Sequence, residues 1–408
     1  MAINDQAKVP IAILMIPLIN AVADVTTNLF PSASINPGNA RAMILILIMC
    51  WFSLRKKLLT KLHLPILVFL GYVLTTVLNT SDVSGWFMNY MKLALTFCGF
   101  MLGYWFIDTT ERLERFNRFS IAAMGIICLN FVLSNVFKLG VSFYAEDTLY
   151  MGGAGANITP NLALIVLVGP LMLYTTDNRW RKFVRSTLIA ISILFVILTL
   201  RRSALLALSG GILVYGFFSP QKKRAIYLVA LGLVGFLVLS LVFQDAFEQR
   251  LAARTVDKHS LQNEARYNET FVVIDEFLTK GLQHALFGSE MFNSVTYFGG
   301  RRGLHVDYNI ILHGSGIVGL LLYLLIYLII VRRFQGISST IRRDRFAAEI
   351  KGVFYALVTA SLLISFSKGL LSIGLRMTFF MFAGALIAII KNRASNRINL
   401  QTEIPPNQ

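Results

Sequence analysis

The sequence predicts an all-α integral membrane protein, and both its composition and its patterning indicate this fold class. Of 408 residues, 56% are hydrophobic and only 14% are charged, with a mean hydropathy of +0.65, whereas a soluble domain carries about a quarter charged residues. Apolar runs of about 15 to 25 residues recur along the whole chain, so a single signal peptide does not explain them. A soluble enzyme is therefore excluded, and one polytopic membrane domain is expected over residues 1 to 408.

About twelve apolar runs are candidates to cross ~30 Å of hydrocarbon as helices, in which each segment satisfies its own backbone hydrogen bonds. In chain order they cover residues 9 to 30, 42 to 54, 63 to 79, 87 to 107, 119 to 137, 161 to 176, 186 to 200, 204 to 218, 225 to 243, 308 to 331, 352 to 371 and 377 to 390. Several runs are short, so these helices need flanking polar residues to complete a span.

The basic residues indicate how the chain is oriented. The formal net charge is +17, but Lys and Arg sit in short clusters between apolar runs, which is typical of topology signals and not of nucleic-acid binding. Most of them fall in alternate connections, at positions 55 to 61, 112 to 118, 179 to 185, 222 to 224 and 332 to 351. The positive-inside rule then predicts that both termini are cytoplasmic.

Two outer connections are longer than the others: residues 139 to 160, which are Gly-rich, and residues 244 to 306, between the ninth and tenth runs. A connection as long as the second exceeds what linking two helices requires, so we expect it to contribute to the active site. Within it, residues 262 to 282 carry an apolar set at helical spacing, formed by Phe271, Ile274, Phe277 and Leu278. This pattern predicts an amphipathic helix on the outer face of the bundle.

Acidic residues are nearly absent from the apolar runs, whereas basic residues lie at their outer ends. Asp24 is the clear carboxylate within a run, which weakens a proton-coupled transporter. The cations at the outer ends of the runs are Arg41, Lys92, Arg201, Arg202, Lys368 and Arg376. Together they suit a lipid-linked anion such as a diphosphate, while each residue alone is also compatible with snorkelling to the interface.

Residues 305 to 319, HVDYNIILHGSGIVG, form the most specific segment, at the point where a helix enters the membrane from the long loop. A straight helix would align His305, Asn309, His313 and Gly316 on one face. His305 falls at the water–lipid boundary, where an imidazole can take a proton from a sugar hydroxyl. His313 is expected to be a deeper packing residue, and the glycines of the segment let a neighbouring helix approach closely.

These motifs resemble those of the bacterial O-antigen ligase and O-antigen polymerase superfamily, over roughly residues 150 to 330. His305, followed by Gly316 and Gly319, is similar to the family's His-x10-Gly-x-x-Gly signature. The other matching segments are Arg202-Ser-Ala-Leu-Leu206 in the turn before the eighth run, GANITPNLAL at 155 to 164, EARYNE at 264 to 269 and HALFGSEMF at 284 to 292.

The resemblance implies a metal-independent, cofactor-free glycosyltransferase of the bacterial inner membrane, active at the periplasmic face. Its donor would be an undecaprenyl-diphosphate-linked oligosaccharide, and His305 would be the base or acceptor-orienting group. Arg202 and Arg266 would bind the diphosphate, with Arg201, Arg301 and Arg302 as supporting ligands.

The acceptor is open between two alternatives. In a polymerase it is another lipid-linked repeat unit, and a chain-length regulator is an expected partner. In a ligase it is lipid A core. Val306, where ligases usually carry Asn, Ser or Gln, and the pair Asp307-Tyr308 favour the polymerase.

A lipid-linked oligosaccharide flippase is the alternative from another class. The long outer loop after the ninth run counts against it, because a transporter built of two six-helix repeats has its central connection elsewhere.

Overall fold

The computed structural model describes residues 10–26, 37–53, 60–139, 159–173, 178–198, 202–242, 244, 248, 265–292, 304–341, 344–367 and 369–402. Within these ranges the regular structure is helical and contains no strand. In chain order the elements are α1 (Ile11–Leu14), α2 (Ile16–Thr26), α3 (Pro37–Ser53), α4 (Leu64–Thr75), η1 (Thr76–Asn79), α5 (Val83–Phe106), α6 (Thr110–Val136), α7 (Thr159–Leu173), α8 (Arg179–Leu198), α9 (Arg202–Phe218), α10 (Lys222–Val242), α12 (Ala265–Thr279), α13 (Leu282–Phe287), α14 (Asp307–Ser338), η4 (Ser339–Ile341), α15 (Arg345–Ile364) and α16 (Ile373–Thr402).

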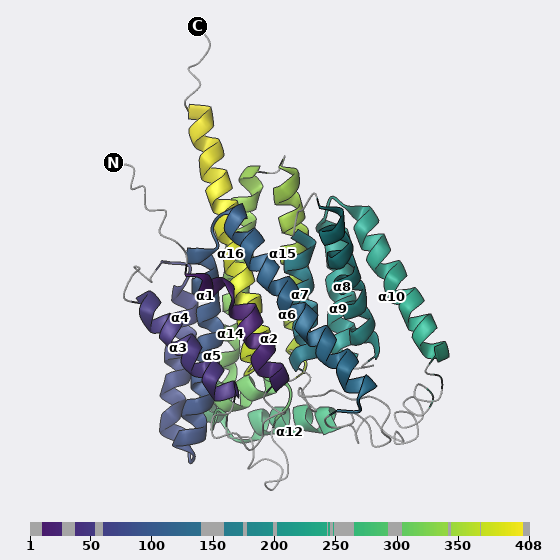
Figure 1. Ribbon diagram of the computed structural model, residues 1–408. Helices are drawn as coiled ribbons and strands as arrows, with labels where there is room; N and C mark the ends of the chain where they lie inside the picture. The colour runs from purple at the N-terminus through teal and green to yellow at the C-terminus, as the bar shows by residue number, and fades with distance from the viewer. Residues whose placement is uncertain are drawn as a thin grey trace.

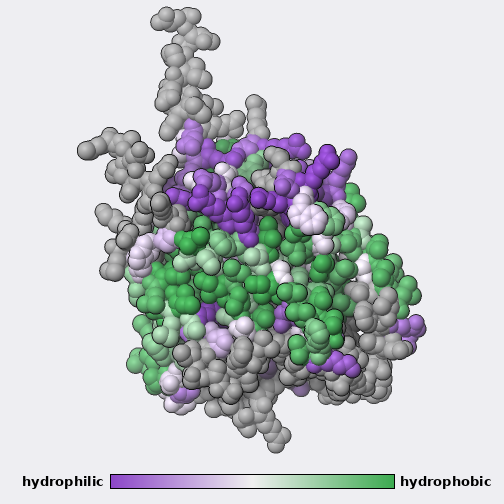
Figure 2. Space-filling model, in the orientation of Figure 1, coloured by the Kyte–Doolittle hydropathy of each residue, from purple (hydrophilic) through white to green (hydrophobic). Residues whose placement is uncertain are grey.

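The all-α membrane class is confirmed at the level of length and composition. Within the described part of the chain, four helical stretches are long and apolar enough to cross a membrane: Thr110–Val136, Asp307–Ile341, Arg345–Ile364 and Ile373–Asn396. On the face that Figure 2 shows, hydrophobic residues form a band across the middle of the molecule, and hydrophilic residues gather at one end. Each predicted apolar run overlaps a helix. The number of spans, about twelve, and the side on which each terminus lies stay predictions.

Local sequence explains where several helices begin. The carboxylate of Asp82 accepts a hydrogen bond from Gly85 N at 2.9 Å at the start of α5, and the Thr109 hydroxyl accepts one from Arg112 N at 3.3 Å at the start of α6. The Asp344 carboxylate caps α15 in the same way. Such side chains satisfy the backbone N–H groups that have no partner within a helix. α7 begins at Thr159, so Pro160 lies in its first turn, where a missing N–H costs no hydrogen bond.

α16 lies at the centre of the bundle (Figure 1), and its apolar stretch is completely buried by other helices. Its most extensive partner is α5. Gly99 and Gly103 of α5, spaced four residues apart, lie against the backbone of Met377 and Met381, and Gly384 of α16 lies against the backbone of Phe100. Small residues at this spacing let two membrane helices pack backbone to backbone.

The helices α12 and α13 and the start of α14 share one end of the molecule. In Figure 1, α12 lies across the lower end of the bundle, and α16 emerges at the opposite end. α10 descends to the α12 end. Because only three residues separate the antiparallel helices α9 and α10, α9 begins at that end, with Arg202 as its first residue. α12, at Ala265–Thr279, confirms the predicted helix within residues 262 to 282.

α14 differs from the predicted straight helix. It begins at Asp307, so His305 precedes it, and Gly316 adopts φ 62° and ψ −168° in its interior. A left-handed φ is accessible to glycine without steric cost and interrupts the helix. The expectation that His305, Asn309, His313 and Gly316 share one helical face is therefore wrong. The break makes room for the backbone of Leu286 and Phe287, against which Gly316 packs.

The α5–α16 contact yields a test. A Cβ added at Gly103 would overlap the Met381 carbonyl group, which is backbone and cannot rotate away. We expect Gly103→Ala to destabilise the protein by about 1–3 kcal/mol, the usual cost of overpacking. Gly125→Ala in α6 is the matched control, because nothing lies within 4 Å of its added Cβ. Unfolding of the purified protein measures both variants, and equal stability of the two would contradict the close-packing interpretation.

Candidate functional site

The candidate site forms where α12 meets the start of α14. The Glu269 side chain on α12 is fully buried. Its Oε1 accepts hydrogen bonds from the backbone N of His305 at 2.8 Å and of Val306 at 2.9 Å, and from Asn309 Nδ2 at 3.3 Å. Val306, the N-cap of α14, provides no side-chain cap of its own. Glu269 therefore supplies from another helix the acceptor and the negative charge that a helix N-terminus favours.

His305 is held at this junction with its ring partly exposed. Its side chain is 36% exposed, and Nδ1 lies 3.8 Å from Glu269 Oε2. A carboxylate beside one ring nitrogen orients an imidazole and stabilises the protonated form, which is how a carboxylate assists a general base. With Nδ1 directed at Glu269, the other ring nitrogen is the one suited to receive a proton from a hydroxyl group.

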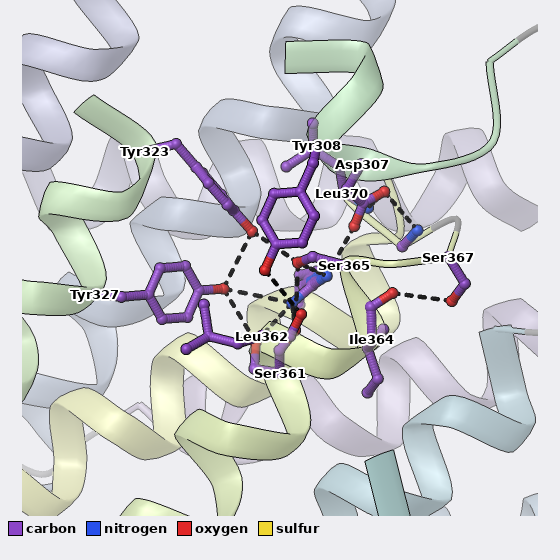
Figure 3. Close-up of polar contacts among 12 residues, drawn as sticks. Asp307, Tyr308, Tyr323, Tyr327, Ser361, Leu362, Ile364, Ser365, Ser367 and Leu370 are labelled. Carbon is purple, nitrogen blue, oxygen red and sulfur yellow. Dashed lines mark hydrogen bonds and ion pairs between the residues drawn. The ribbon is translucent and has the colours of Figure 1, made fainter. Parts of the chain in front are cut away.

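Two residues after His305, a buried ion pair fixes the start of α14 (Figure 3). Asp307 is fully buried, and its Oδ2 accepts a hydrogen bond from Arg376 Nη2 of α16 at 2.8 Å. Asp307 Oδ1 accepts from the backbone N of Gly369 and of Leu370, both at 2.8 Å. Each carboxylate oxygen thus has a partner, as a buried charge requires.

Serine and tyrosine side chains complete this network. Arg376 donates to Ser361 Oγ at 2.6 Å and to Ser365 Oγ at 2.7 Å on α15 and its C-terminal cap. The hydroxyl groups of Tyr323 and Tyr327 on α14 lie 3.1 and 3.0 Å from Ser365 Oγ and Ser361 Oγ, respectively. The network therefore joins α14, α15 and α16, and it begins at Asp307, two residues after His305.

The segment around α13 packs on the broken part of α14. Ser289 N donates to the His313 carbonyl group at 2.9 Å, and Gly288, at φ 75°, lies against the backbone of Gly314 and Ser315. The prediction that glycines of α14 permit close approach is confirmed, although the neighbour is the long loop itself. His313 is buried, as predicted, but it lies beside polar groups of the loop: Glu276, His284 and Ser289.

His284 also lies in this polar surrounding, outside the membrane-spanning stretches. Partial burial lowers the pKa of its imidazole, and the nearby charge of Lys280 acts in the same direction, against the opposing effect of Glu276. The neutral imidazole is therefore favoured at neutral pH.

The basic residues predicted to bind an anionic lipid lie in different environments. Arg376 was expected to face an anionic lipid, but its guanidinium is buried and paired with Asp307, so that expectation is wrong. Arg41 forms an ion pair with Asp24 between α3 and α2. Arg202 does not lie in the turn but opens α9, where it is exposed at the α12 end.

The remaining predicted ligands are described only in part. Arg266 lies on α12, three residues before Glu269, and its side chain is outside the described part of the chain. Arg201, Arg301, Arg302 and Lys368 also lie outside the described residues.

The sequence alone did not identify Glu269 and Asp307 as site residues, or Arg376 as the buried partner of Asp307. Glu269 is the last residue of EARYNE, a segment noted only for its arginine. Asp307 follows His305 by two residues and was used only to compare acceptor classes. A buried carboxylate and a buried arginine far apart in sequence are each expensive in a membrane, so the presence of both signals a pair.

No protein-family model matches this chain, and no curated protein matches it either.

The Asp307–Arg376 pair can be tested by removing one charge. Arg376→Met leaves the Asp307 carboxylate buried without its main partner, and we expect a loss of about 3–5 kcal/mol in unfolding free energy. The control is Arg393→Met, which breaks the partly exposed Arg393–Asp344 pair at 2.8 Å and should cost about 0–1 kcal/mol. Denaturation of both purified variants gives the comparison. A loss from Arg376→Met no larger than that of the control would show that the network does not hold the three helices together.

Proposed function

We propose that the protein is a membrane glycosyltransferase that moves a glycan from undecaprenyl diphosphate to a sugar hydroxyl, as in the O-antigen polymerase and ligase superfamily that its motifs resemble. The observation that carries the proposal is the His305–Glu269 pair at the end of the bundle. A partly exposed imidazole backed by a buried carboxylate is an arrangement suited to general-base catalysis.

The reaction needs little from the protein beyond proton transfer and charge stabilisation. The acceptor hydroxyl oxygen forms a bond to the anomeric carbon of the donor, and the bond from that carbon to the diphosphate oxygen breaks. The electron pair of the broken bond leaves with the diphosphate, and the hydroxyl proton passes to His305. Glu269, 3.8 Å from Nδ1, then stabilises the imidazolium.

Arginines on two elements would bind the departing diphosphate. Arg202 opens α9 at the end of the bundle at which α12 lies. Arg266 lies on α12 itself, one turn from Glu269. Guanidinium groups bind phosphate oxygens through two parallel hydrogen bonds and stabilise the charge that develops as the bond breaks. Arg201, Arg301 and Arg302 remain supporting candidates within this proposal.

Among acceptors, we favour a second lipid-linked repeat unit, which makes the protein a polymerase at the periplasmic face of the inner membrane. Val306 and the Asp307-Tyr308 pair support this choice over a ligase that uses lipid A core. In the structure both residues of this pair bond to other helices or their flanking residues: Asp307 pairs with Arg376, and the Tyr308 hydroxyl donates to the Leu362 carbonyl group at 2.9 Å.

The first test replaces the base. His305→Ala should lower the turnover of purified lipid-linked repeat units by about 10²- to 10⁴-fold, the usual contribution of general acid–base catalysis. Glu269→Gln should lower it less, because the amide still accepts hydrogen bonds but no longer stabilises imidazolium. Gln283→Ala, an exposed change in the same loop, is the control and should keep full turnover.

Folded protein is quantified for each variant, so that lost activity is separated from lost protein. Full turnover by His305→Ala would end its assignment as the base. Transfer to a lipid A core acceptor without polymer formation from repeat units would change the proposal from polymerase to ligase.

The second test concerns the diphosphate. If Arg202 binds it through a two-pronged guanidinium contact, Lys at that position offers a point charge without the geometry. Arg202→Lys should therefore lower turnover by about tenfold or more, since a lost charge-assisted hydrogen bond costs ~1.5–3 kcal/mol. Titration of the donor substrate measures the effect. Wild-type kinetics in this variant would make Arg202 a snorkelling residue and not a ligand.

A further inference from the structure

A second polar cluster, separate from the His305 site, joins three elements at the α12 end. It consists of Glu276 on α12, His284 on α13 and His313 on α14. One donor atom from each residue lies within 4.8 Å of the other two, and His313 Nδ1 is 3.7 Å from Glu276 Oε2. His313 is buried, and the side chain of Glu276 is only 20% exposed.

We propose that Glu276, His284 and His313 bind a divalent transition-metal ion, with Zn²⁺ as the best match. Two imidazoles and one carboxylate are a common protein ligand set for zinc when a water molecule occupies the fourth position. A tetrahedral ion with bonds of ~2.1 Å holds its ligand atoms ~3.4 Å apart. The 3.7 Å pair is close to this separation, and the donor atom of His284, within 4.8 Å of the other two, would move nearer to them when the ion binds.

The neighbours of the three ligands are suited to orient them. Ser289 Oγ lies 3.2 Å from His313 Nε2 and 3.3 Å from Nδ1, so the hydroxyl can bond one ring nitrogen while the other binds the metal. Lys280 Nζ lies 2.7 Å from Glu276 Oε1, which leaves Oε2 on the side of His313. Partners of this kind fix the tautomer and orientation of metal ligands.

The charge balance also permits a dication. Two neutral imidazoles and the Glu276 carboxylate leave one positive charge on the complex, and Lys280 adds to it. The carboxylate of Glu290 also lies near His313 and supplies a further negative charge. Mg²⁺, which prefers oxygen ligands, is disfavoured because two of the three ligand atoms are nitrogen atoms.

The ion would connect the loop to the bundle. α12 carries both Glu276 and, two turns earlier, Glu269, which bonds the backbone of His305. A metal that joins α12 and α13 to α14 would therefore hold Glu269 in register with the start of α14. This role is structural: the metal would help to position Glu269 beside His305, but it would take no part in the chemistry of the glycosyl transfer proposed above.

The experiment measures metal content and not activity. Full-length protein without an affinity tag, purified in detergent, is stripped with a chelator, dialysed against Zn²⁺ and analysed for bound metal. We expect about one Zn²⁺ per chain in the wild type and at least ~100-fold weaker binding in His284→Ala and in Glu276→Gln, since even indirect partners of a metal contribute 10- to 100-fold. His305→Ala, which removes a histidine at the same end of the molecule, should bind like the wild type.

Two further measurements control for misfolding and for nonspecific metal binding. His284 is only partly buried, so its replacement should leave the fold intact, and Zn²⁺ should raise the unfolding temperature of the wild type but not of His284→Ala. Co²⁺ in place of Zn²⁺ should give the visible absorption of a tetrahedral site. Absence of bound Zn²⁺ in the wild type, or equal binding in wild type, His284→Ala and Glu276→Gln, would overturn the proposal.

Discussion

The ion pair between Asp307 and Arg376 is the constraint on which the rest of this end of the molecule depends. Both side chains are almost completely inaccessible to solvent, and an unpaired charge in that position would cost several kcal/mol. The carboxylate must therefore lie where Arg376, Gly369 N and Leu370 N can all reach it. That requirement fixes the first residue of α14 against the turn before α16 and against the serines of α15.

The position of His305 follows from this anchor and from a second one. Asp307 N donates to the Ser365 carbonyl group at 3.1 Å, so the chain two residues upstream has little freedom. Glu269 then binds the backbone of His305 and Val306 from the opposite side. The histidine is thus held between a network inside the bundle and α12. A catalytic group needs such support, because small displacements of a reacting group cost large factors in rate.

The sequence was sufficient for the fold class, the approximate helices and the importance of residues 305 to 319, because these depend on local hydropathy and spacing. It was insufficient for pairings between distant residues. Asp24 was identified as an intramembrane carboxylate, but its partner Arg41 was interpreted as an anion ligand. Glu349, buried and bonded to Ser219 at 2.7 Å, lies near the start of an amphipathic helix and resembled a surface residue. Gly316 fits either a straight or a broken helix, and only packing against Leu286 and Phe287 selects the latter.

The break at Gly316 connects these observations. A continuous helix would present side chains to the loop at every turn and keep its backbone at a distance. Because Gly314 and Gly316 carry no side chain, the loop residues 286 to 291 reach the backbone of α14, and Ser289 bonds the His313 carbonyl group. The segment around α13 is therefore packed into the bundle and does not merely lie on its surface. Because this segment packs so closely, α12 can place the buried Glu269 carboxylate beside His305 at the start of α14.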